Sequence, residues 1–202
     1  MKALPIALVI LMAAGAAFGD KKDEGRFAPG PASSYSSKQT NDNVTVAAVA
    51  YDSEEMAHTA FGKLNPNQYG VLPVLVILQN DTGQALRLDN VEVEYIGADG
   101  RKVEATPASD VQYLNGGPRR PTPNTGSPFP IPRGKPKNPL AAWEIEGRAF
   151  APKLLPPHES ANGFFYFQTR HLPGGKFYLT GIQQAGSGKE IFYFEIPLEY
   201  HK

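Results

Sequence analysis

Four histidines have the widest chemical range in this sequence, because an imidazole can ligate a metal or transfer a proton near neutral pH. They are His58, His158, His171 and His201. None is spaced from another histidine or from a pair of carboxylates as a metal-binding element requires, so no metal site is predicted. His158 and His171 flank a predicted strand and could meet across the fold. A site formed by these two histidines and the carboxylate of Glu159 therefore stays an open alternative.

Paired carboxylates are a second candidate, because acidic side chains perform general acid–base hydrolysis. Glu92 and Glu94 alternate along one predicted strand and therefore share a face, about 7 Å apart. A glycosidase needs its acid and base on opposed elements, so an outward polar face is the preferred interpretation. The sequence has no serine-hydrolase elbow, HExxH zinc motif or EF-hand loop. We therefore predict that the chain is not an enzyme and has no catalytic residue, cofactor or metal.

Residues 185–190 (AGSGKE) resemble part of a phosphate-binding loop. In the full motif, Gln183 would stand where the first glycine is required. Glu190 would replace the serine or threonine that binds magnesium. The segment is better explained as a glycine-rich hairpin turn.

The most unusual segment is residues 115–139, where prolines are dense enough to favour extended, unpaired backbone. Between Pro118 and Lys137 it contains five cations and no acidic residue. Such an exposed loop would attract an anionic polymer or an acidic envelope protein, and a phenylalanine would add apolar contact. A solvated, poorly ordered insertion is the alternative. The candidate binding residues are Arg119, Arg120, Phe129, Arg133, Lys135 and Lys137.

The first nineteen residues fit a cleavable secretory signal peptide. Lys2 precedes an uncharged apolar stretch, and small side chains at Ala17 and Gly19 mark a cleavage site. The apolar stretch is shorter than the about 20 residues that span a bilayer, so no membrane span is expected after cleavage. The sequence has no cysteine for a lipid anchor or a disulfide. We expect an exported protein, periplasmic or secreted, that is not lipid-anchored.

The amino-acid composition limits both the class of partner and the class of fold that we expect. The chain has 20 Lys and Arg against 20 Asp and Glu, which gives no global attraction to nucleic acid. Twenty glycines and nineteen prolines, with abundant Phe and Tyr, favour a turn-rich β protein. Residues 20–42 are mostly polar and small, so they are predicted to form a flexible tether.

The order of the remaining elements follows from hydrophobic patterning. Residues 52–62 predict a short helix, with Asp52 and Glu55 at capping-box spacing and Gly62 at its end. Residues 71–79 are apolar on both faces, as in a strand covered on both sides. Alternation over 85–105 predicts a β-meander. Further strands are predicted at 44–51, 163–168, 176–183 and 190–198, and helical turns at 139–146.

About seven strands, most of them separated by turns, predict an all-β domain over 43–202 with one or two short helices and the exposed Pro-rich loop. The preferred architecture is an immunoglobulin-like β-sandwich, with a closed barrel as the alternative. The sequence shows no alternation of strand, helix and strand, which is the pattern that would indicate a parallel sheet.

Two segments carry a resemblance to a known class of protein. They are Gly70–Asn80, followed by alternating strands, and the aromatic run Ala161–Phe167 with its closing aromatic strand. Together they resemble exported bacterial immunoglobulin-like sandwich domains of uncharacterised function, over roughly residues 43–200. The resemblance implies a non-enzymatic binding or scaffolding role in the cell envelope. A carbohydrate- or polymer-active hydrolase, and a structural surface or adhesin component, are the alternatives.

Overall fold

The computed structural model describes residues 27–114 and 138–201. These residues are mostly β, with three short α-helices and three 3₁₀ helices. The strands are β1 (Lys38–Asn41), β2 (Val44–Ala50), β3 (Leu72–Asn80), β4 (Leu86–Arg87), β5 (Glu92–Ile96), β6 (Lys102–Thr106), β7 (Leu154–Leu155), β8 (Ser160–Phe167), β9 (Lys176–Thr180), β10 (Gln183–Gln184) and β11 (Phe194–Pro197). The helices are η1 (Ala32–Ser34), α1 (Glu54–Phe61), η2 (Pro66–Tyr69), α2 (Ala108–Val111), η3 (Pro139–Ala141) and α3 (Trp143–Gly147).

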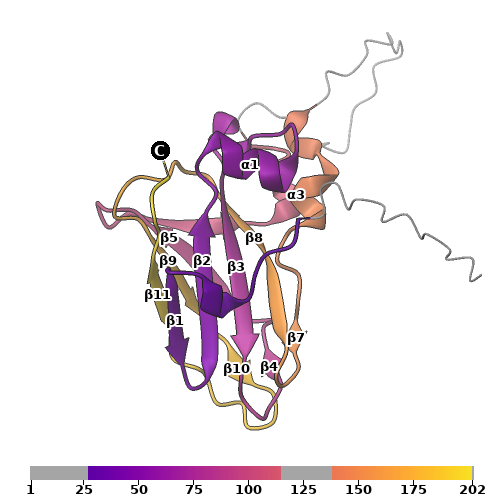
Figure 1. Ribbon diagram of the computed structural model, residues 1–202, viewed down its shortest axis with the longest axis vertical. Coiled ribbons are helices and arrows are strands. Elements are labelled where there is room, and N and C mark those ends of the chain that lie inside the picture. The colour runs from indigo at the N-terminus through magenta and orange to yellow at the C-terminus, as the bar shows by residue number, and fades with distance from the viewer. Residues whose placement is uncertain (1–26, 115–137, 202) are drawn as a thin grey trace, which may run out of the picture.

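Two antiparallel sheets make up the described β-structure (Figure 1). The larger has eight strands in the order β1-β2-β3-β8-β6-β5-β9-β11, and the smaller has the order β10-β4-β7. The all-β class is confirmed, and the described chain has eleven strands where about seven were predicted. The immunoglobulin-like topology is not confirmed by this strand order and stays a prediction.

The larger sheet bends until its two edge strands lie side by side. Side chains of β1 reach β11 in place of a backbone ladder: the Gln39 amide oxygen accepts from the Glu195 N–H at 2.8 Å. The Asn41 amide donates to the Tyr193 carbonyl at 2.8 Å. The sheet is therefore nearly closed, in the manner of a barrel.

The central strand β3 explains why its sequence is apolar on both faces. Leu72, Val74, Val76 and Leu78 point into the core enclosed by the bent sheet. The alternate residues Leu75 and Ile77 face a second core under the helices. The prediction of a strand covered on both sides is confirmed.

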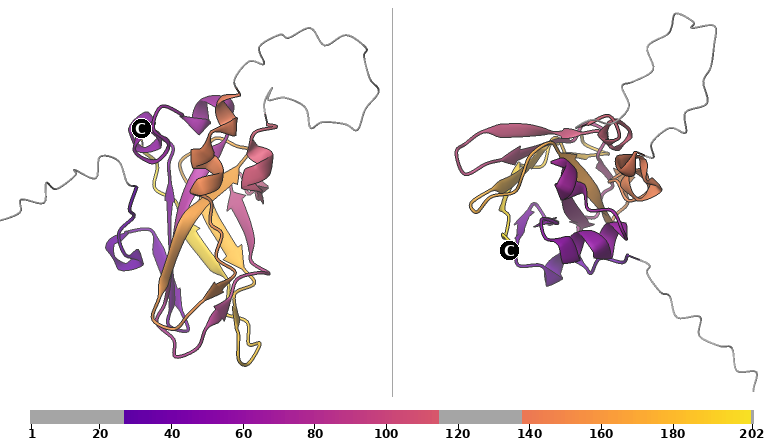
Figure 2. Two further views of the ribbon diagram at one scale, coloured as in Figure 1. Left: turned by 90° about the vertical axis from the view of Figure 1, so that its right-hand side faces the viewer. Right: turned by 90° about the horizontal axis from the view of Figure 1, so that it is seen from above.

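The three α-helices gather at one end of the β-structure (Figure 2). Phe61 of α1 and Ile145 of α3 pack in the same core as Phe164 and Tyr166 of β8. The Tyr166 hydroxyl donates to the Ile145 carbonyl at 2.7 Å, which ties α3 to the sheet. Burial raises the pKa of Tyr166, so this hydroxyl stays protonated and keeps its donor.

The start and end of α1 follow the sequence signals, with one correction. The helix lies within the predicted 52–62 and ends at Gly62, which has a positive φ of 63°. Its cap is Ser53 rather than Asp52, because the Ser53 side chain accepts from the Met56 N–H. Asp52 is instead engaged by His201 near the C-terminus.

The tether predicted over residues 20–42 is wrong for its described part, residues 27–42. Phe27 packs 5.4 Å from the ring of Phe164, and Ala32 in η1 is buried. Strand β1 pairs with β2 through its backbone, so a polar composition did not prevent order. Residues 20–26 lie outside the described residues.

Two further predictions about strands are corrected. The meander over 85–105 holds only for the β5–β6 hairpin, because β4 pairs with β7 and β10 in the smaller sheet. Of the residues predicted as a strand at 190–198, only Phe194–Pro197 form one, which is β11. Phe192, which lies within the predicted strand, is 67% exposed, while Phe194 and Ile196 are buried.

Candidate functional site

The predicted binding residues belong to the segment that leaves α2 and returns at η3. Arg119, Arg120, Phe129, Arg133, Lys135 and Lys137 lie outside the described residues. At the edges of the gap, the Asn138 side chain donates to the Gln112 carbonyl at 2.5 Å and accepts from the Leu140 N–H at 3.1 Å. The two points where the chain departs and returns are therefore held together, and the predicted basic loop stays a prediction.

A cleft of about 490 Å³ opens where β6 changes its partner. Residues Lys102–Glu104 of β6 pair with β5, and residues Ala105 and Thr106 pair with β8. Beyond this crossing, Glu92 and Val93 of β5 have no described strand on that side, and Val91 precedes them. The cleft thus lies between β5 and β8, in the wall of the bent sheet.

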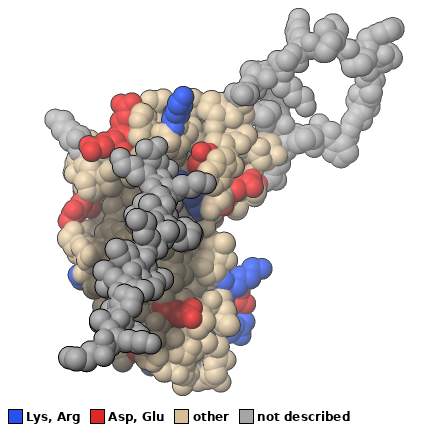
Figure 3. Space-filling view, turned by 45° about the vertical axis from the view of Figure 1, so that its right-hand side comes forward, with Lys and Arg blue, Asp and Glu red and all other residues tan. Residues whose placement is uncertain are grey.

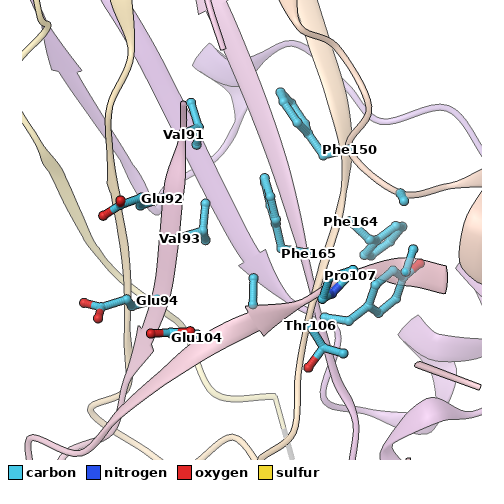
Figure 4. A pocket seen from close by; sticks show the side chains of 14 residues that line it. Val91, Glu92, Val93, Glu94, Glu104, Thr106, Pro107, Phe150, Phe164 and Phe165 are labelled. Carbon is cyan, nitrogen blue, oxygen red and sulfur yellow. The ribbon is translucent and has the colours of Figure 1, made fainter. Parts of the chain in front are cut away.

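Two phenylalanines form the apolar wall of the cleft (Figure 4). Phe150 and Phe165 are half-buried, and their rings stack 5.3 Å apart with an interplanar angle of 22°. Val93 of β5 and Val91, just before that strand, stand opposite them. All four side chains pack on the core inside the sheet, so the cleft exposes the edge of that core to solvent.

Gly163 sets the position of the wall that carries Phe150. The Phe150 N–H donates to the Phe164 carbonyl at 3.0 Å, and the Phe164 N–H donates to the Arg148 carbonyl at 2.8 Å. A Cβ at position 163 would lie 2.5 Å from the Phe150 Cα. Only glycine permits this approach of the 148–150 backbone to β8.

Three glutamates line the rim of the cleft, and their carboxylates point away from the phenylalanines (Figure 4). Glu94 and Glu104 are direct cross-strand partners. The Lys102 ammonium lies 2.7 Å from the Glu94 carboxylate, and this hydrogen bond raises the pKa of Lys102. Glu92 and Glu104 have no ion-pair or hydrogen-bond partner among the described side chains.

This arrangement bears on the hydrolase alternative. Glu92 and Glu94 lie on one strand, as the sequence indicated, and point to the same side of it in Figure 4. They do not face one another across the cleft, which is the arrangement that an acid–base pair needs. The rim is better suited to attracting a cation than to cleaving a bond.

The histidines do not assemble as the sequence suggested. His158 precedes β8 and His171 follows it, so they lie beyond opposite ends of an eight-residue strand, which is about 26 Å long. His171 instead lies 3.9 Å from Asp52, which also contacts His201 at 3.2 Å. Among residues 27–114 and 138–201, no group of three metal-ligating side chains is close enough to hold a metal ion.

The hydrogen bonds of His171 define its protonation. Its Nε2 lies 3.1 Å from the Glu199 carbonyl, which can only accept, so Nε2 carries the proton. Its Nδ1 then accepts from the Tyr95 hydroxyl at 3.1 Å. Burial lowers the pKa of His171, although the Asp52 carboxylate opposes this shift. The buried, neutral imidazole joins the C-terminal residues to the β-structure.

On one face of the molecule, charge is mixed rather than separated by sign. The face in Figure 3 shows Lys and Arg interspersed with Asp and Glu. Within the described residues, no helix is both long and apolar enough to cross a membrane.

Comparison with known proteins adds little to this geometry. No family model matches the chain, and no curated protein matches it. Among solved structures, a functionally unknown protein from Listeria monocytogenes EGD-e is similar at 10% identity and a TM-score of 0.37, covering 79% of each chain.

Sequence reasoning missed the cleft because it depends on a change of strand partner. Phe150 lies in a segment between predicted elements, and Phe165 belongs to an aromatic run whose neighbours are fully buried. No local pattern distinguishes a half-buried phenylalanine from a buried one. Pairing between β6 and β8 is a long-range feature that periodicity does not encode.

Proposed function

We propose that this chain is an exported, non-enzymatic binding protein of the bacterial cell envelope, and that the cleft between β5 and β8 receives an extended segment of a protein partner. Export rests on the N-terminal sequence pattern. The binding mode rests on one observation: beyond Glu94, β5 has no described strand on the side of the cleft. We further infer that the two halves of the bent sheet, joined at β6, face each other like the layers of a sandwich.

An unpaired strand edge recognises extended peptides through main-chain hydrogen bonds, and adjacent pockets select alternate side chains. Here the edge at Val91–Val93 lies opposite Phe150 and Phe165. An apolar side chain of the partner would cover these rings. Burial of such area is worth about 25 cal/mol per Å².

The rim selects the charge of the partner. Glu92 and Glu104 lack a described cationic partner, and the ion-pair partner of Glu94 is Lys102. Side chains on the other face of a bound strand would point to this rim, because successive residues alternate. We therefore expect an extended segment in which apolar residues alternate with Lys or Arg.

A pair of synthetic peptides tests this proposal by calorimetric titration of the full chain. One alternates valine and lysine over six residues, and the other alternates valine and glutamate. The lysine peptide is expected to bind, and its affinity to fall with added salt. Equal binding of both peptides, or no binding of the lysine peptide, would contradict the proposal.

A variant that fills the cleft tests whether the lysine peptide binds there. Ala105 is half-buried and lines the cleft, so Ala105→Leu should weaken the lysine peptide by about tenfold. Ala185→Leu adds the same atoms at an exposed hairpin and should leave affinity unchanged. If Ala105→Leu folds normally and binds as the parent does, the peptide lies elsewhere and the cleft is not the site.

A further inference from the structure

Two exposed aromatic side chains and a half-buried one form a surface on the outer face of β9 and the segment before β11. We call Tyr178, Phe192 and Tyr193 the aromatic platform. The rings of Tyr178 and Tyr193 stack 5.5 Å apart with an interplanar angle of 30°. Phe192 lies 4.5 Å from Tyr193, and the two are 67% and 39% exposed. The Lys102 ammonium also lies over the Tyr178 ring, 5.3 Å from its centre.

A hollow of about 450 Å³ adjoins the platform, and the buried residue Ile191 is part of its lining. Polar groups surround it. Lys189 contacts Asp42 at 2.7 Å, and the Thr180 hydroxyl donates to Glu190 at 3.3 Å. The hollow therefore offers apolar faces next to fixed hydrogen-bonding groups.

The strand register extends this polar surface away from the hollow. Tyr178 is directly paired with Glu94 on one side and with Glu195 on the other. Directly paired residues of antiparallel strands share a face, so the platform continues into a row of carboxylates. The carboxylates thus lie beside the aromatic rings and point to the same solvent-exposed side.

The charges on this face exclude an anionic ligand. Each of its lysines has a carboxylate partner: Lys102 pairs with Glu94, Lys176 with Glu195 and Lys189 with Asp42. Additional carboxylates at Glu92, Glu104 and Glu190 leave the face with more acids than cations. A polyanion would be repelled. A ligand rich in neutral hydroxyl groups would find acceptors for its O–H donors.

We infer that the aromatic platform binds a neutral oligosaccharide, with sugar rings lying on Phe192 and Tyr193. A pyranose ring has an apolar face of C–H groups and a periphery of hydroxyls. The aromatic rings can contact the apolar C–H face, and the carboxylate and threonine side chains can hydrogen-bond to the hydroxyls. The lysine–carboxylate pairs hold those acceptors in place. This site is separate from the cleft and does not depend on the proposed peptide binding.

Neither a place in the core nor insertion into a membrane fits the platform as well. A core role does not fit the exposure of Phe192. A membrane-inserting surface would present apolar tips without a surrounding row of carboxylates, which a bilayer with anionic headgroups repels. The combination of exposed rings and surrounding acidic side chains therefore favours a neutral, hydroxyl-rich sugar chain.

Neutral and charged hexasaccharides provide the test. The full chain is titrated with β-1,4-linked hexamers of glucose and of N-acetylglucosamine, and with hexagalacturonate, while binding is followed by NMR of the tyrosine and phenylalanine rings. At least one neutral hexamer is expected to bind and to shift the Tyr193 and Phe192 signals. Hexagalacturonate is expected not to bind. Failure of both neutral hexamers at millimolar concentration, or equal binding of hexagalacturonate, would overturn the inference.

Substitutions test whether the sugar binds at the platform or at another part of the surface. Phe192→Ala and Tyr193→Ala remove exposed rings and should each weaken the neutral hexamer by about tenfold. Trp143→Ala removes another exposed aromatic, on α3, and should change nothing. Unchanged affinity in both platform variants would refute the assignment, as would binding to neutral lipid vesicles that Phe192→Ala abolishes. Ala105→Leu should not affect sugar binding, so the two sites can fail independently.

Discussion

At the scale of single residues, the cleft depends on a glycine that permits two backbones to approach. Gly163 lies in β8 beside Phe164, which forms an isolated parallel bridge with Ala149. The sequence shows Gly163 as the start of an aromatic run, and nothing local marks it as a contact point. Its role becomes visible only when residues 148–150 are placed against β8.

Gly163→Ala is expected to lower the free energy of unfolding by about 1–3 kcal/mol, because the added Cβ overlaps the Phe150 backbone. Urea denaturation measures the change. Gly186→Ala is the control, since a Cβ there meets its nearest atom, in Gln84, at an ordinary 3.5 Å. Equal stability of the two variants would show that the 148–150 segment can move away from β8 without cost.

At the scale of elements, strand positions were predictable where hydrophobic patterning is strong. The strand β3 and the β5–β6 hairpin follow directly from apolar runs and alternation. Strand β1 was missed because its four residues are polar, and its pairing with β2 uses backbone groups that every residue carries. Strand β11 was predicted too long because the apolar residue Phe192 does not reach the core.

The contact between β1 and β11 yields a prediction about local stability. Gln39→Ala removes the acceptor of the Glu195 N–H, a hydrogen bond worth about 1 kcal/mol. The Glu195 amide should therefore exchange with solvent roughly fivefold faster. Thr40→Ala, on the same strand, should leave that amide unaffected. Unchanged exchange in Gln39→Ala would mean that the edges close by packing alone.

The C-terminal residues depend on the protonation state of His171. Its pKa in the folded chain is lowered from the usual 6.5, mainly by burial. The unfolded chain then binds a proton more readily, so stability rises with pH. The contribution is fully present above about pH 6.5 and is lost as the pH falls through the lower folded value.

Denaturation of the parent chain should therefore become easier as the pH falls from about 7 to about 5. His171→Gln keeps polar contacts without a titrating ring and should reduce this dependence. The exposed His58, which lies 3.8 Å from Glu54, serves as the control in His58→Gln. An identical pH dependence in the parent and in His171→Gln would rule out His171 as its source.

At the scale of the whole molecule, composition and patterning predicted a mostly β chain but not how its strands join. The strand β6 pairs with β5 and then with β8, which bends the sheet and creates the cleft. Such partner changes arise from long-range packing, so local periodicity cannot reveal them. The predicted basic loop, from Arg119 to Lys137, lies outside the described residues and stays a separate hypothesis for binding.

The proposed and inferred sites lie on connected parts of one surface. The row of Glu104, Glu94 and Tyr178 runs from the rim of the cleft to the aromatic platform. An exported protein with both sites could hold a protein segment next to a neutral glycan. The charge of this row favours cationic and neutral ligands over the anionic polymer predicted for the basic loop.

The most direct test of the cleft is amide chemical-shift mapping of the full chain during titration with the peptide that alternates valine and lysine. We expect shifts concentrated at Val91–Val93 and at Ala149–Phe150, with slower exchange of the Val91–Val93 amides. The smaller sheet of β4, β7 and β10 should remain unchanged. Shifts confined to other strands, or no change along the β5 edge at saturation, would contradict the proposal that this edge receives the partner.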